Sequence, residues 1–168
     1  SLTGTNDWTK VTVEGTAPGG ATQAWIHITP AVRDGVGRFW IDQCAVEEKP
    51  RPNLLPNPGF EDGLNGWSRG GTWAAVTDAA HGGVSAAYCQ VPSGGDTYIC
   101  RGYDFGRSIA GTGFRATAWL KTENATRVWL RTYWKDANGH WIWQEMNSAS
   151  LSGTNGWTKV SVDGVAPP

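Results

Sequence analysis

The segment near the start of this chain returns near its end. Residues 2–18 read LTGTNDWTKVTVEGTAP, and residues 151–167 read LSGTNGWTKVSVDGVAP. Aligned without gaps, 12 of the 17 positions are identical, at an offset of 149 residues. Self-similarity at a fixed period is typical of repeat arrays, and this period is the size of a domain. We therefore expect the chain to begin late in one copy and to stop before the second copy is complete.

The boundary between the two copies is expected at EKPRPN, residues 48–53, because its two prolines cannot continue a central strand. Residues 1–48 would then be the C-terminal part of one repeat. Residues 49–52 would be a linker, and residues 53–168 would be the N-terminal part of the next repeat.

Composition narrows the class of partner. The net charge of −1 and the mixed signs give no basic face, which argues against a nucleic-acid partner. No apolar run approaches the roughly 20 residues of a membrane span, so no membrane insertion is expected. Eleven tryptophans are more than a small core buries easily. Several should therefore lie at the surface, where exposed aromatic side chains usually mark a binding face.

The hydrophobic pattern predicts strands, because short alternating runs are separated by turn residues and no 3.6-residue period is sustained. This pattern is typical of an all-β sandwich. The expected strands are 8–14, 23–29, 37–47, 73–77, 85–91, 97–105, 113–122, 126–135, 140–146 and 157–163.

The three cysteines suggest one bridge. Cys89 and Cys100 flank a segment with Gly94-Gly95 at its midpoint. A two-residue Gly-Gly turn would place the two cysteines opposite each other on paired strands, within reach of a disulfide. The spacing favours a disulfide, and hence an oxidising compartment, over two buried free thiols. Cys44 is expected to be a small buried hydrophobe.

Five motifs resemble a known group of proteins. In order from residue 53, NLLPNPGFEDGLNGWS (53–68), AAHGGVSAAYCQV (79–91), GTGFRATAWLKTE (111–123) and NGWTKVSVDGVAP (155–167) are similar to strands of the jelly-roll carbohydrate-binding modules, the group that includes families 4, 9 and 22. The final strand of that group, aromatic and ending in Asp, is found instead at GRFWIDQCAVEE (37–48). The resemblance therefore covers nearly the whole chain in circularly permuted order.

This resemblance implies an all-β jelly-roll sandwich of two antiparallel sheets. Residues 2–150 would complete one permuted sandwich, and residues 151–168 would be a duplicate strand without a place in it. A spare strand has unpaired backbone groups and can pair with another chain. The alternative is that the chain is cut across a tandem-repeat boundary.

The resemblance also implies a structural Ca²⁺ ion. Its ligands would be Glu61 and Asp42, with backbone oxygens around Gly83 and Ser85. Ca²⁺ takes six to eight oxygen ligands and mixes carboxylates with carbonyls. Gln43 stands where the group often has a second Asp. The alternative is that both carboxylates lie at the surface without a metal.

Strand alternation indicates an outward aromatic face that suits sugar binding. Aromatic rings stack on the C–H face of a pyranose, and nearby polar groups read its hydroxyls. Some of these tryptophans would instead fill the core or contact another subunit, and alternation does not say which outward faces share a sheet. The candidate residues are Trp25, His27, Trp119, Trp129, Arg131, Tyr133, Trp141, Trp143 and Gln144.

Catalysis finds little support. The three histidines lack metal-type spacing, His81 matches a histidine of the family motif and is expected to be structural, and no G-x-S-x-G elbow occurs. We expect a non-catalytic, extracellular module (secreted, cell-surface or virion-associated) that binds a polysaccharide or cell-surface glycan. The alternative is a structural repeat of an extracellular fibre, adhesin or phage tail protein that pairs with other copies of itself by strand exchange.

Overall fold

The computed structural model of the chain describes residues 2–17, 21–48 and 53–167, and the expected linker at 49–52 lies outside these ranges. The described residues form strands and contain no helix, so none that could cross a membrane. The strands are β1 (Leu2–Thr16), β2 (Ala21–Ile28), β3 (Val36–Glu48), β4 (Ser68–Gly70), β5 (Trp73–Val76), β6 (Ala86–Pro92), β7 (Tyr98–Asp104), β8 (Gly113–Val128), β9 (Leu130–Asp136), β10 (Trp141–Asn147) and β11 (Leu151–Val165).

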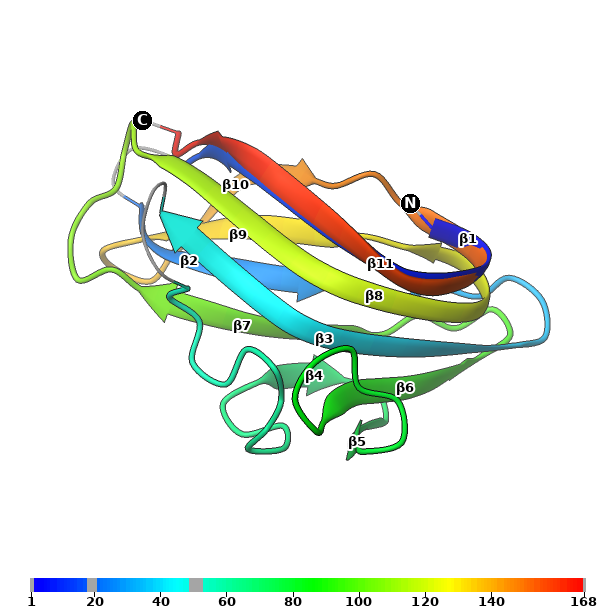
Figure 1. Cartoon of the computed structure of the whole chain (residues 1–168). Helices are drawn as coiled ribbons and strands as arrows, with labels where there is room; N and C mark the ends of the chain where they lie inside the picture. The colour runs from blue at the N-terminus through cyan, green and yellow to red at the C-terminus, as the bar shows by residue number, and fades with distance from the viewer. Residues whose placement is uncertain (1, 18–20, 49–52, 168) are drawn as a thin grey trace.

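The strands form two sheets (Figure 1). The first has the order β1-β11-β8-β3-β6-β5, with β1 also paired directly with β8, and the second has the order β10-β9-β2-β7-β4. The predicted all-β class with two sheets is thus confirmed, and nine of the ten expected strands are present as single strands, whereas the expected strand 126–135 is divided between the end of β8 and β9. The short β4 was not expected, and β8 continues past its predicted end at residue 122.

Alternation along each strand builds the core between the sheets. On β2, Ile26 and Ile28 are fully buried, whereas Trp25 and His27 on the opposite side are partly exposed. Trp134 of β9 is also fully buried, and its ring meets Phe114 of β8 edge-on at 4.6 Å between centroids. Because β8 and β9 belong to different sheets, this contact joins the two layers.

The repeated segments, β1 and β11, lie along the same length of β8. Val11 and Val160 both face Ala118, and the same one-to-one match continues along both strands. Figure 1 shows the two ribbons, blue and red, running together beside β8. We refer to this position at the end of the first sheet as the β8 edge site.

The predicted disulfide between Cys89 and Cys100 is wrong, because both are free thiols. Cys89 lies on β6, which pairs with β3 and β5, whereas Cys100 lies on β7 of the other sheet. Gly94 is therefore not in a hairpin turn between paired strands, and its N–H instead donates to the Val32 carbonyl at 2.8 Å. Cys44 is fully buried as expected.

Candidate functional site

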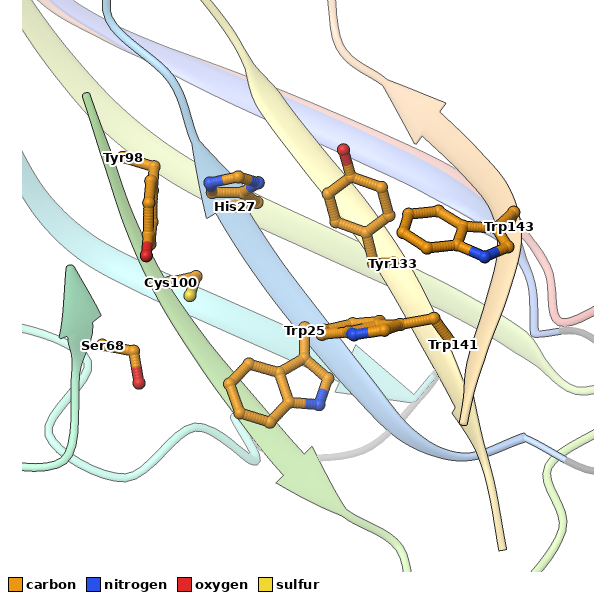
Figure 2. Close-up of a pocket in the computed structure, with 8 residues that line it drawn as sticks. All are labelled: Trp25, His27, Ser68, Tyr98, Cys100, Tyr133, Trp141 and Trp143. Atoms are coloured by element: carbon orange, nitrogen blue, oxygen red, sulfur yellow. The ribbon is translucent and has the colours of Figure 1, made fainter. Parts of the chain in front are cut away.

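An aromatic pocket opens on the second sheet, on the side away from the core (Figure 2). Its volume is about 430 Å³. The side chains come from five strands, β2, β4, β7, β9 and β10, so the whole sheet contributes. The residues that line this aromatic pocket are Trp25, His27, Ser68, Tyr98, Cys100, Tyr133, Trp141 and Trp143.

Strand β2 is the centre of the pocket because it pairs on both sides. Trp25 faces Tyr133 on β9 and Gly102 on β7. A side chain at position 102 would collide with the Trp25 indole, so glycine there makes room for the ring. His27 faces Cys100 on the β7 side. The outward residues of three neighbouring strands thus converge on one depression.

The rings of the pocket meet mostly edge to face. Trp141 lies 5.8 Å from Trp25 at 64° and 5.9 Å from Tyr133 at 71° between ring centroids. Trp143 is 78% exposed and Trp141 is 40% exposed, so β10 presents exposed ring surface at the mouth. Edge-to-face contacts fix the orientation of neighbouring rings, which gives a ligand a preformed surface.

His27 lies between two tyrosines, Tyr98 at 4.7 Å and Tyr133 at 5.6 Å between ring centroids (Figure 2). Burial, followed by the positive charge of Arg131, lowers the pKa of His27 from 6.5 to about 4, against a small opposing effect of Glu145. The imidazole is therefore neutral at neutral pH. Its Nε2 atom is buried and has no hydrogen-bond partner among the described residues.

Charged side chains border the aromatic pocket. The Arg131 guanidinium donates to the Tyr133 hydroxyl at 2.7 Å and lies 3.3 Å from a Glu145 carboxylate oxygen. The Lys135 ammonium lies over two pocket rings, 5.0 Å from the centroid of Trp25 and 4.4 Å from that of Trp141. Polar donors therefore stand directly beside the ring faces.

The structure brings together most of the residues predicted for sugar binding, but not all. Trp119 lies on β8 in the other sheet, where its ring stacks on His81 at 3.8 Å. Trp129 is only 7% exposed and is covered by the guanidinium groups of Arg127 and Arg131. Gln144 lies outside the pocket lining. Alternation alone does not distinguish these positions, because it ignores which strands pair.

Three pocket residues were not expected from the sequence. Tyr98 and Cys100 alternate on β7, and Ser68 stands opposite Cys100 on β4. Burial raises the pKa of the Cys100 thiol to about 11, so this thiol is neutral. The period-two spacing of Tyr98 and Cys100 marks them as sharing a face, but only the pairing of β7 with β2 puts that face in the pocket.

A second candidate site surrounds Asp42, whose side chain is fully buried on β3. Its carboxylate accepts three backbone N–H bonds, from Gln43 at 2.7 Å, His81 at 2.8 Å and Gly82 at 2.7 Å. Burial, together with the negative charge of Glu61, raises the pKa of Asp42 to about 6 despite these bonds. A cation beside Asp42 would therefore be attracted by two acidic groups.

Glu61 contacts the loop of residues 81–85, which also supplies two of the N–H groups that donate to Asp42. Its carboxylate accepts the backbone N–H of Val84 at 3.1 Å and of Ser85 at 3.4 Å, and it packs on Gly83. The described residues offer no third acidic, histidine or cysteine ligand for a metal here. The predicted set thus fits Ca²⁺ only if carbonyl oxygens and water complete it, which is a ligand mixture that Ca²⁺ accepts.

The backbone explains why Asp42 and Glu61 lie near each other. The pairing of β3 with β8 is irregular between Asp42 and Ala45, and Gln43 adopts a φ of 49°. At this bulge the Cys44 N–H turns to the Pro58 carbonyl at 2.6 Å, which ties the segment before Glu61 to β3. A bulge that redirects one strand is a common device beside a site.

Comparisons with protein-family models, with curated proteins and with solved structures find no match to this chain. Its function has to follow from the chemistry of the aromatic pocket and of the carboxylate pair.

Proposed function

We propose that this chain is a non-catalytic carbohydrate-binding module of the jelly-roll type that holds a polysaccharide or cell-surface glycan in the aromatic pocket. The observation that carries the proposal is the convergence of exposed ring faces with hydrogen-bond donors on one side of a sheet. Trp141 and Trp143 supply exposed ring surface, Lys135 lies over the Trp141 ring, and Arg131 donates to the hydroxyl of the pocket residue Tyr133. An extracellular setting, as a secreted, cell-surface or virion-associated module, belongs to the same proposal.

The volume of the aromatic pocket suits a short segment of a glycan. The volume of about 430 Å³ lies within the range of roughly 300–1,000 Å³ that is typical of ligand pockets. A pyranose would stack its C–H groups on the Trp143 ring, which is an apolar contact. Its hydroxyls would replace hydrogen bonds to water with hydrogen bonds to donors at the rim of the pocket. The neutral His27 offers a buried Nε2 atom that has no hydrogen-bond partner among the described residues.

The lining of the pocket supports binding without catalysis. Of the described residues, the eight that line it include no Asp or Glu. Glycoside hydrolysis usually requires two carboxylates placed on either side of the bond that breaks. The acidic side chain at the rim, Glu145, is paired with Arg131 at 3.3 Å. The lining of the aromatic pocket therefore suits sugar binding better than sugar cleavage.

We propose in addition that Asp42 and Glu61 hold a structural Ca²⁺ ion, with oxygens of the loop around Gly83 and Ser85. When bound, the ion would supply positive charge between two carboxylates that otherwise repel each other. It would join β3, the segment before Glu61 and the 81–85 loop. Because Asp42 lies on β3 of the first sheet and the aromatic pocket is on the second sheet, the ion would not contact a bound sugar.

Isothermal titration calorimetry with a panel of soluble polysaccharides tests the sugar-binding proposal. At least one glycan should release heat with the wild-type chain, and Trp143→Ala should weaken that binding by about tenfold or more, which corresponds to about 1.4 kcal/mol. Because Trp143 is 78% exposed, this substitution should leave the unfolding midpoint in urea nearly unchanged.

The matched control is Trp119→Ala, which removes a tryptophan from the other sheet. It should leave glycan affinity intact. Equal loss in both variants would mean that the affinity does not come from the pocket. A complete panel without any binding heat would overturn the proposed function.

A further inference from the structure

The β8 edge site receives two segments of one chain. Lys10 and Lys159 are both opposite Trp119, and Thr12 and Ser161 are both opposite Thr117. Both strands run antiparallel to β8 with the same matching of residues. The indole rings of Trp8 and Trp157 fall in the same place. Two side chains cannot fill one volume at once, so β1 and β11 are alternative occupants of this site.

The polar contacts show the same competition. The Thr122 hydroxyl accepts from the Asn6 amide at 3.0 Å and from the Asn155 amide at 2.9 Å. It also donates to the carbonyls of Gly4 and Gly153, at 3.0 Å in each case. A hydroxyl has one proton to donate, so it serves one strand at a time. Each strand satisfies Thr122 fully when it is seated.

The apolar contacts are also equivalent. Val11 and Val13 of β1 are fully buried, and Val160 and Val162 of β11 are each 5% exposed. Both pairs project between the sheets from the same two positions opposite β8. Whichever strand is not seated exposes these valines and a row of unpaired backbone groups to water. Such an edge is a template for pairing with another chain.

We propose that the unseated strand of one copy occupies the β8 edge site of a second copy of this chain, so that copies are joined by strand exchange. The inference goes beyond glycan binding and does not depend on it. Main-chain hydrogen bonds to β8 and the pockets for the two valines would be the same as in the unexchanged arrangement.

Because β1 and β11 make equivalent contacts with β8, these contacts determine how tightly two copies associate by exchange. Replacing a seated strand with an identical one forms no additional contact, while association of two free molecules costs translational and rotational freedom. Separate wild-type copies should therefore exchange without forming a tight complex. Exchange becomes favourable when the acceptor lacks a competent strand of its own, or when linkage gives neighbouring copies a millimolar effective concentration.

The first test asks whether either strand is sufficient. Val11→Asp/Val13→Asp disables β1, and Val160→Asp/Val162→Asp disables β11, because each places two charges between the sheets. Each double variant should retain one cooperative urea unfolding transition, with the intact strand seated. Loss of folding in either variant would show that both strands are needed at once, and would overturn the inference.

The second test combines all four substitutions in an acceptor chain that has an open β8 edge site. The acceptor is refolded from urea with an equal amount of tagged donor, and native mass spectrometry records mixed complexes. Wild-type donor, which has one strand to spare, should form a 1:1 complex. The donor with Val160→Asp/Val162→Asp needs its remaining strand for itself and should bind at least about 100-fold more weakly.

Both results of this comparison are informative even if the acceptor does not fold alone. Recovery of soluble acceptor only with wild-type donor supports strand exchange. No mixed complex, or equal capture by both donors, would overturn it. A glycan titration of the same wild-type protein separates this result from the proposed sugar binding, because the aromatic pocket lies on the other sheet.

Discussion

The acid sensitivity of the fold should depend on His27. Its pKa is about 4 in the folded protein and 6.5 when unperturbed, so the unfolded chain takes up a proton first as the pH falls. The stabilising contribution is therefore complete above pH 6.5, decreases below it, and levels off below about pH 4. At 1.36 kcal/mol per pKa unit, the full effect is about 3 kcal/mol.

Most of this loss of unfolding free energy should occur between neutral pH and about pH 5. Between about pH 7.5 and pH 5 the linkage amounts to roughly 2 kcal/mol of unfolding free energy. Urea unfolding at the two pH values gives this quantity for the wild type and for His27→Gln, which cannot take up the proton. The wild type should lose about 2 kcal/mol more than the variant, because all other titrating groups are common to both.

The matched control is His140→Gln, since the His140 side chain is 79% exposed in the loop between β9 and β10. It keeps His27 and should therefore retain the His27-dependent loss of unfolding free energy. If His27→Gln and the wild type lose the same free energy over the interval, burial does not hold His27 neutral and the reasoning about the pocket fails. An NMR titration that finds His27 protonating near its ordinary pKa would refute it as well.

Three further outcomes are expected. Ca²⁺ at about 100 times its dissociation constant should raise the unfolding free energy by about 2.7 kcal/mol, and Glu61→Gln should abolish this gain in thermal unfolding scans. A reductant should leave the melting temperature unchanged, and alkylation of the denatured, unreduced chain should label Cys89 and Cys100, as mass spectrometry would report. Phe39→Ala should cost about 3–5 kcal/mol in urea unfolding, because Phe39 is 1% exposed in the core; a loss below about 1 kcal/mol would contradict this packing.

Local pattern was sufficient to find the strands, because alternation is a property of a few consecutive residues. Ile26 and Ile28 face the core and Trp25 and His27 face outward, as the sequence predicts. The ends were less predictable. The β4 segment is only three residues long, and such a strand has too few positions to show a period.

Pairing between strands was the part that the sequence did not reveal. Trp119 and Trp143 have the same outward pattern, yet they lie on different sheets. Cys89 and Cys100 are separated by a plausible hairpin turn, yet their strands never pair. Pairing is decided by packing over the whole fold, so residues such as Tyr98 join the pocket only through partners distant in the chain.

The central place of β2 also has a kinetic meaning. Trp25 is paired with Gly102 on one side and Tyr133 on the other, so both neighbours of this early strand are made much later during synthesis. Until β7 and β9 have been synthesised, both edges of β2 remain unpaired, and this strand contains β-branched residues. Spontaneous refolding should accordingly be slow. Nascent chains at high local concentration would tend to aggregate before β9 is synthesised.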